Sequence, residues 1–237
     1  MRHLYGKRPV MERLQTAPKT IRTLYLQEAA DTAEIIQMAK RASCAFRILS
    51  KQAFAKLAGD VHAQGVLAEV EGFQYAALED LLEKRPLPIL FFLDRLTDPQ
   101  NLGAILRSMA CLGGVVLVLP KHDSVEVNDT VLRVACGGEN YVPVSLVTNL
   151  VQASELAKKA GYWLAGAVPL GGTPLHKVSW PETVGVILGS EGSGIRSGLA
   201  KHADFTVTLP MQGADLSFNV ATAAALIAYE ITRSRLK

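Results

Sequence analysis

Three clusters of polar residues and glycines in the second half of the chain have residue types that ligand binding and catalysis require. They are Asp94-x-x-x-Asp98-Pro99-x-Asn101-x-Gly103 followed by Arg107, then Gly189-x-Glu191-Gly192-x-Gly194, and then Leu209-Pro210-Met211 followed by Ser217-Phe218-Asn219-Val220. Each cluster follows a run of apolar residues that is typical of a buried strand.

The glycine-rich cluster restricts the chemistry of its ligand. Glycines after a strand usually indicate a phosphate site, because backbone N–H groups can then approach the anion closely. Here Glu191 stands in the middle of the loop, and its negative charge would repel a phosphate. The loop lacks both the lysine of a P-loop and the G-x-G-x-x-G order of a dinucleotide site. The sequence therefore favours a neutral or cationic ligand.

Each polar residue also has a purely structural interpretation. Asn101, Ser217 and Asn219 stand where helices are expected to begin, so they could cap helices. The charged residues could form ion pairs of small energetic value. These alternative pairs are Glu191 with Arg196, and Arg107 with an acid such as Asp94.

The second half of the chain alternates between strand and helix patterns, which predicts a mainly parallel sheet flanked by helices. Six strands are expected, at ILFFLD, VVLVLP, VPVSL, WLAGAV, VGVIL and FTVTL. Helices are expected near residues 101–112, 126–136, 149–160, 195–201 and 217–235. Ligands bind outside the carboxyl ends of the strands in such sheets, and the three clusters follow the first, fifth and sixth strands.

The first half predicts a smaller α/β unit. Helices are expected at about residues 7–16 and at TAEIIQMAKRA and KQAFAKLA, with strands at TLYLQ, FRILS and QGVLAEV. A short acidic helix, ALEDLLEKR, then leads into the proline-containing RPLP segment. We expect a first domain over residues 1–75, a linker over 76–88 and a second domain over 89–237.

Charge and composition narrow the class of protein. Residues 1–59 contain 11 Lys or Arg and 4 Asp or Glu, whereas residues 89–237 contain 12 of each. This concentration of positive charge predicts either a polyanion-binding surface or ordinary solvated charges. No transmembrane segment or signal peptide is apparent, so we expect a cytoplasmic protein. The histidines and the three widely spaced cysteines predict free, buried thiols and neither a disulfide framework nor a metal site.

The ordered triplet of clusters resembles the three motifs of the SpoU-type (TrmH-like) RNA ribose 2′-O-methyltransferases, a family of the SPOUT superfamily. The resemblance covers residues 89–237, and Tyr5-Gly6 and Gln64-Gly65 are similar to the small substrate-binding domain of many members. It implies a C-terminal domain with a deep trefoil knot, S-adenosylmethionine as cofactor and a homodimer. The expected substrate is a ribose 2′-hydroxyl in structured RNA, with a guanosine of large-subunit ribosomal RNA favoured over transfer RNA.

The resemblance also assigns roles to individual residues. It gives Arg107 the task of deprotonating or orienting the 2′-hydroxyl, although a guanidinium stays protonated and could instead hold a phosphate. The residues expected to position RNA and cofactor are Asn101, Glu191, Ser217 and Asn219. The residues expected to contact the cofactor are Gly189, Leu209 and Phe218.

Two other classes of protein stay open from the sequence. One is a nucleotide-dependent oxidoreductase or transferase on a doubly wound sheet, against which the missing phosphate-binding motifs argue. The other is a noncatalytic RNA-binding factor for ribosome assembly that keeps the same fold.

Overall fold

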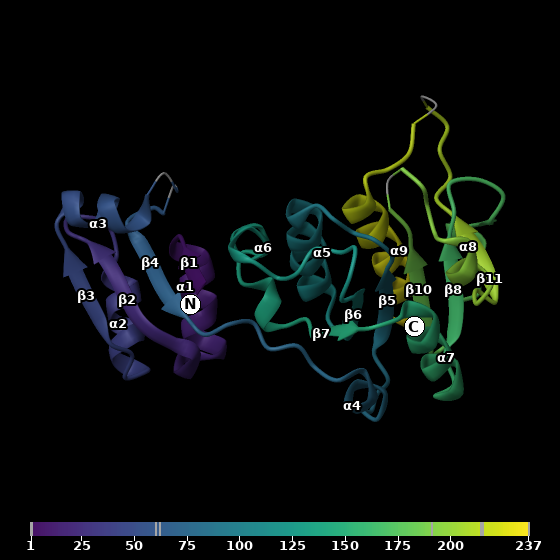
Figure 1. Cartoon of the computed structure of the whole chain (residues 1–237), viewed down its shortest axis with the longest axis horizontal. Coiled ribbons are helices and arrows are strands. Elements are labelled where there is room, and N and C mark those ends of the chain that lie inside the picture. The colour runs from purple at the N-terminus through teal and green to yellow at the C-terminus, as the bar shows by residue number, and fades with distance from the viewer. Residues whose placement is uncertain (1, 60, 62, 191, 214–215, 237) are drawn as a thin grey trace.

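The computed structural model describes residues 2–59, 61, 63–190, 192–213 and 216–236. It contains two sheets, one from each half of the chain (Figure 1). The larger sheet has the strand order β7-β6-β5-β10-β8-β11-β9, and all its pairs are parallel. Its strands are β5 (Ile89–Leu93), β6 (Val115–Pro120), β7 (Val144–Val147), β8 (Trp163–Ala167), β9 (Thr173–Pro174), β10 (Val184–Leu188) and β11 (Phe205–Thr208).

All six strands expected for this sheet are present, and the expectation of exactly six strands was wrong because β9 adds a seventh. β9 has two residues and pairs with β11 at the edge of the sheet. A strand of this length has no hydrophobic period that the sequence could reveal.

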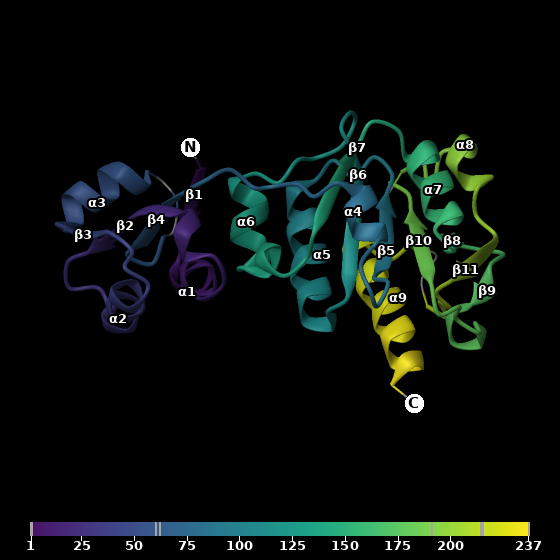
Figure 2. The same cartoon turned by 90° about the horizontal axis from the view of Figure 1, so that it is seen from below.

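Helices cover both faces of the larger sheet, which explains the continuous apolar runs. Side chains alternate along β5, so Phe91 packs with one face and its neighbour Phe92 with the other. Figure 2 shows α7 and α8 on one side of the sheet and α9 on the other. The helices are α4 (Leu78–Leu82), α5 (Pro99–Leu112), α6 (Asp129–Ala135), α7 (Leu150–Lys159), α8 (Ser197–Ala200) and α9 (Val220–Arg235).

The N-terminal unit is a four-stranded sheet of order β1-β4-β2-β3 with its own helices. The expected helices and strands are all present, and β1 is an additional strand that pairs antiparallel with β4. The elements are β1 (Arg2–Tyr5), α1 (Lys7–Thr16), β2 (Ile21–Gln27), α2 (Ala33–Arg41), β3 (Phe46–Leu49), α3 (Lys51–Ala58) and β4 (Val66–Val70).

The three cysteines differ from the expectation of buried thiols. They are free, but Cys111 is exposed and Cys44 and Cys136 are half-buried. No helix in the described part of the chain is both long and apolar enough to cross a membrane.

Candidate functional site

A cavity of about 430 Å³ lies at the carboxyl edge of the larger sheet. Its walls come from the segments that follow β8, β10 and β11 and from the first turns of α9 (Figure 1). This is the edge at which open parallel sheets bind ligands. The three residues expected to contact the cofactor, Gly189, Leu209 and Phe218, all line the cavity, and so does Ser217.

The described walls of this cavity carry no charged side chain, and their polar side chains are Ser190, Ser193 and Ser217. One described cation contacts this wall from outside the lining, because the Arg95 Nη2 donates a hydrogen bond to the Ser193 hydroxyl. The described lining residues are uncharged and have main-chain groups beside them, which suits S-adenosylmethionine, so the residues present fit the expected cofactor. In the described residues, no group of three or more His, Cys, Asp or Glu side chains could hold a metal ion.

The loop after β10 folds back on itself beside the cavity. The Gly194 N–H donates a hydrogen bond to the Ser190 carbonyl at 3.0 Å, and the hydroxyls of Ser190 and Ser193 are 2.8 Å apart. A Cβ at Gly189 would overlap the backbone of Gly194 and Ile195. This loop therefore requires glycine at position 189. Glu191 lies outside the described residues, so its expected role stays a prediction.

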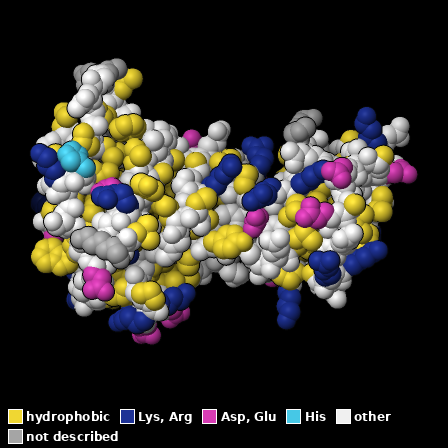
Figure 3. All heavy atoms as spheres, turned by 180° about the vertical axis from the view of Figure 1, so that it is seen from behind, with side chains coloured by type: hydrophobic (Ala, Val, Ile, Leu, Met, Phe, Trp, Pro, Cys, Tyr) yellow, Lys and Arg dark blue, Asp and Glu magenta, His cyan; other side chains and the backbone are white. Residues whose placement is uncertain are grey.

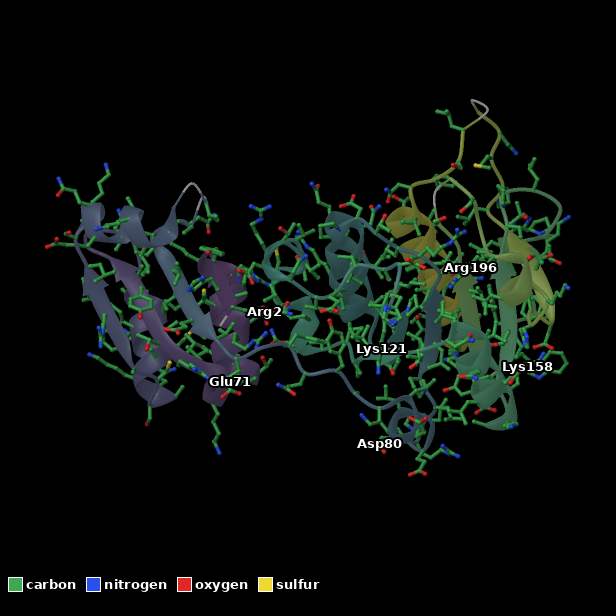
Figure 4. The ribbon with its side chains drawn as sticks, viewed as in Figure 1. Arg2, Glu71, Asp80, Lys121, Lys158 and Arg196 are labelled. Atoms are coloured by element: carbon green, nitrogen blue, oxygen red, sulfur yellow. The ribbon has the colours of Figure 1, made fainter. Side chains whose placement is uncertain are left out.

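An ion pair with a buried carboxylate ties this loop to the end of β5. The Asp94 side chain is 0% exposed and accepts hydrogen bonds from the backbone N–H of Arg196 at 2.9 Å and from its Nε at 2.8 Å. The Nη2 of Arg196 is also 2.7 Å from Asp94. Figure 4 shows Arg196 near the upper ends of β5 and β10. The structural alternatives that paired Asp94 with Arg107, and Arg196 with Glu191, did not foresee this pair.

Two of the expected positioning residues meet at the first turns of α5 and α9. The Asn219 Nδ2 donates a hydrogen bond to Asn101 Oδ1 at 2.9 Å. Asn219 also caps α9 by accepting a hydrogen bond from the Ala221 N–H at 2.9 Å. The cap of α5 is Asp98, whose side chain accepts from the Gln100 N–H, so Asn101 is not the cap that its position suggested. The asparagine pair connects the first and third sequence clusters.

Arg107 does not lie with these residues. It is exposed on α5, it is not among the residues that line the cavity, and its Nη1 contacts the sulfur of Cys136 at 3.8 Å. Arg107 also touches the 3₁₀ turn Gly138–Asn140, because a Cβ at Gly138 would come within 3.0 Å of the Arg107 Cα. Within one chain, the described residues therefore place the expected catalytic arginine on the α6 side of α5, apart from the cavity.

The sequence interpretation missed the Asp94–Arg196 ion pair and a second ion pair, Arg13 with Glu139, in which both side chains are buried. Their members are 102 and 126 residues apart in the chain. The only sequence signal for Asp94 is its place directly after a buried strand, where a carboxylate needs a partner. Nothing in the sequence marks Glu139.

Family profiles match both halves of the chain. The SpoU rRNA Methylase family matches residues 88–229, and the domain described as RNA 2′-O ribose methyltransferase substrate binding matches residues 3–76.

Curated relatives align along most or all of the chain. The 23S rRNA (guanosine-2′-O-)-methyltransferase RlmB of Coxiella burnetii is 34% identical and the alignment covers 99% of this chain and 96% of that protein. RlmB of Neisseria meningitidis serogroup B is 33% identical over 99% of this chain and 96% of that protein. An uncharacterized tRNA/rRNA methyltransferase of Synechocystis is 39% identical over 73% of this chain, which spans only 46% of that relative.

Solved structures share the whole fold. The SpoU methyltransferase AviRb of Streptomyces viridochromogenes, in complex with AdoMet, superposes with a TM-score of 0.80 over 99% of this chain and 90% of that chain, at 24% identity. An RNA methyltransferase of the TrmH family from Porphyromonas gingivalis gives a TM-score of 0.75 over 98% and 89%, at 25% identity. The chain therefore belongs to the SpoU rRNA methylase family and is an RNA ribose 2′-O-methyltransferase.

Proposed function

We propose that this protein methylates the ribose 2′-hydroxyl of a guanosine in 23S ribosomal RNA. The observation that carries the proposal is the cavity at the sheet edge, which is lined by the residues expected to contact the methyl donor and whose described lining is uncharged. Full-length similarity to RlmB enzymes, whose names specify a 23S rRNA guanosine, supports the choice of RNA. Such a substrate would be met in the cytoplasm.

S-adenosylmethionine supplies a methyl group on a sulfonium, and the transfer forms a carbon–oxygen bond while the carbon–sulfur bond breaks. The positive charge on sulfur disappears in this step, and the 2′-hydroxyl releases its proton to solvent water. The described lining of the cavity favours this change, because it is uncharged and can hold the reacting groups in a fixed orientation. Gly189, Leu209 and Phe218 hold the cofactor in this proposal, and Ser217 borders the same space.

The asparagine pair and Arg107 act on the RNA side of the reaction. The Asn219 Nδ2 donates a hydrogen bond to Asn101 Oδ1 at 2.9 Å, which joins the first turns of α5 and α9, and Glu191 is also expected to position RNA or cofactor. Arg107 orients the ribose and an adjoining phosphate with its planar guanidinium, which stays protonated at neutral pH.

The division of labour between domains follows the charge. Residues 1–75 bind RNA, residues 76–88 link the two domains, and residues 89–237 hold the cofactor and the catalytic residues. The N-terminal unit exposes basic side chains on α3, at Lys51 and Lys56, and on β3, at Arg47. These side chains would contact phosphates without reading the sequence.

A homodimer accounts for the separation of Arg107 from the cavity. A second copy that packs against the outer side of α9 would bring its own Arg107 toward the cavity of the first. The outer side of α9 exposes Leu226 and Tyr229, at 40% and 58%, and a second copy packed there would cover these two side chains. We further infer the trefoil knot of the family in the segments that border the cavity.

A mixing experiment tests the dimer. Arg107→Ala and Gly189→Val each remove a different part of the site, so each homodimer should be inactive. If one site uses residues from two copies, a mixture that exchanges subunits regains activity. If both parts come from one chain, the mixture stays inactive.

Methyl transfer from labelled S-adenosylmethionine tests the reaction and its substrate. Purified protein is given 23S rRNA, 16S rRNA or transfer RNA, with Gly189→Val as the inactive control. We expect one methyl group per 23S molecule, on a guanosine 2′-oxygen. Label on transfer RNA alone would instead assign the same chemistry to that substrate.

A further inference from the structure

The N-terminal unit is joined to the catalytic sheet by a buried ion pair. Arg13 on α1 and Glu139 in the turn Gly138–Asn140 place Nη2 and Oε1 3.1 Å apart, with side chains 8% and 0% exposed. Arg13 is also held within its own unit, where its Nη1 donates to Thr20 Oγ1 at 3.3 Å. The pair therefore connects two anchored side chains across the junction between the two sheets.

Other contacts at this junction are equally close. The Tyr141 hydroxyl donates a hydrogen bond to Glu12 Oε2 at 2.8 Å. A Cβ at Gly137, whose φ is +94°, would overlap the side chain of Glu12. Segment 136–141 is thus packed directly on α1.

The other side of the same segment touches the expected catalytic arginine. Cys136 contacts the Arg107 guanidinium at 3.8 Å, and Gly138 packs on the Arg107 backbone so closely that a Cβ would lie 3.0 Å from its Cα. Segment 136–141 therefore lies between the N-terminal unit and Arg107. A displacement of the unit would act on Arg107 through a segment of six residues.

The surface around this junction is basic. Figure 3 shows Lys and Arg side chains gathered across the middle of the molecule, over α6 and the adjoining part of the N-terminal unit. The exposed arginines of the elements that meet here are Arg8 on α1, Arg107 on α5 and Arg133 on α6. An RNA strand that contacts both units would be presented to Arg107 in one defined position only if the two units keep a fixed spacing.

A buried ion pair is poor evidence for stability alone. Apolar residues of similar volume often stabilise a protein as well, whereas the loss of one partner leaves an uncompensated charge. Burial raises the pKa of Glu139, and the nearby Arg13 guanidinium opposes that effect only in part. The Glu139 Oε2 has no hydrogen-bond partner among the described residues. The pair is therefore a costly contact whose benefit is a defined geometry.

We propose that the Arg13–Glu139 pair is a clamp that fixes the N-terminal unit beside Arg107, so that RNA bound by this unit presents its ribose to the catalytic site. Glu139 and Arg13 are positioning residues in this account, because they act through segment 136–141. The inference rests on the proposed RNA methylation.

The test compares Glu139→Gln, Arg13→Met and the double variant with the full-length protein. Asp31→Asn is the matched control, because it also removes one negative charge from an ion pair. Asp31 pairs with Lys7, and the Asp31 side chain is 92% exposed. Four quantities are measured: the Kd for S-adenosylmethionine, the Kd for RNA, the single-turnover rate at saturating RNA, and the distribution of distances between fluorophores on the two units.

We expect Glu139→Gln to leave both Kd values within about threefold, to broaden the distance distribution, and to lower the rate at least ~10-fold, equivalent to about 1.4 kcal/mol of positioning energy. The double variant should lose no more than Glu139→Gln alone, because both changes break one contact. The control should match the wild type in all four quantities. Normal cofactor binding shows that each variant is folded. Arg13→Met removes the same ion pair from its other side and is therefore an independent test of it.

Two outcomes would overturn the clamp. One is a wild-type rate and distance distribution in both single variants, and the other is a double-variant loss equal to the product of the two single losses. If the wild type itself transfers no methyl group to RNA, the proposed function is wrong. The distance distribution still decides in that case whether the pair holds the two units together.

Discussion

Replacement of Asp94 by alanine should weaken cofactor binding without a direct contact to the cofactor. Asp94 is not among the residues that line the cavity, but its carboxylate holds the backbone N–H and the guanidinium of Arg196 at 2.7 to 2.9 Å. Arg196 follows directly on the glycine loop that forms one wall. Loss of the carboxylate should therefore release this wall.

The size of the effect follows from these contacts. A hydrogen bond to a charged group contributes about 1.5–3 kcal/mol. The Arg196 side chain is 44% exposed, so in the variant water would replace part of the hydrogen bonding that its guanidinium loses. The full free energy of a charged hydrogen bond therefore applies only to the buried Asp94 carboxylate. We take about 2 kcal/mol as the free energy that orders the loop. This value predicts a Kd for S-adenosylmethionine that rises about 30-fold.

Isothermal titration calorimetry measures this Kd directly. Asp98→Ala is the matched control, because Asp98 lies in the same β5–α5 connection but caps α5 and makes no described hydrogen bond to the glycine loop. Asp94→Asn should fall between the two, since an amide oxygen can still accept from the Arg196 N–H. If Asp94→Ala binds the cofactor as tightly as Asp98→Ala, the ion pair does not order the loop and the reasoning is wrong.

Three further predictions concern catalysis, pH and salt. Arg107→Lys and Arg107→Ala should both lose at least ~100-fold in single-turnover rate and bind the cofactor normally, because lysine lacks the planar guanidinium group. A lysine variant with a rate within a few-fold of wild type would show that Arg107 is a phosphate contact only. Burial raises the pKa of Tyr162 from 10.0 to about 12, so its contribution to stability is complete below pH 10 and is lost as pH rises toward 12. The free energy of unfolding of Tyr162→Phe, measured in urea, should therefore depend less on pH above pH 10. The variant also loses the 2.9 Å hydrogen bond to the Pro88 carbonyl, which contributes about 1 kcal/mol. A pH dependence above pH 10 equal to that of the wild type would contradict this assignment. Replacing Lys51 and Lys56 by glutamine should reduce the salt dependence of RNA binding by one to about two counterions, and an unchanged slope would remove α3 from the RNA surface.

Most strands of the catalytic sheet were predictable because they are continuous apolar runs in a chain that alternates between strand and helix patterns. Phe91 and Phe92 both had to be buried, which requires cover on both faces of the sheet. β1 and β9 were missed because Arg2–Tyr5 and Thr173–Pro174 are short edge strands with little burial of their own. Their position depends on pairing with distant strands, which no local pattern records.

The site was predictable as a set of residue types but not as an arrangement. Strand ends in a parallel sheet bring Gly189 and Leu209 to one edge, and this follows from alternation alone. The direction of Arg107 depends on how α5 packs between α9 and α6. The partner of Asp94 depends on how the loop after β10 folds back. Such long-range choices are set by tertiary packing and not by spacing along the chain.

The most direct test of the proposed function is a transcriptome-wide map of ribose 2′-O-methylation in cells with and without this protein. We predict that one guanosine in 23S rRNA loses its methyl group when the protein is absent, and that it regains the methyl group with the wild type but not with Arg107→Ala. A 23S rRNA map that is identical in both cells, or a lost methyl group in transfer RNA alone, would contradict the proposed substrate.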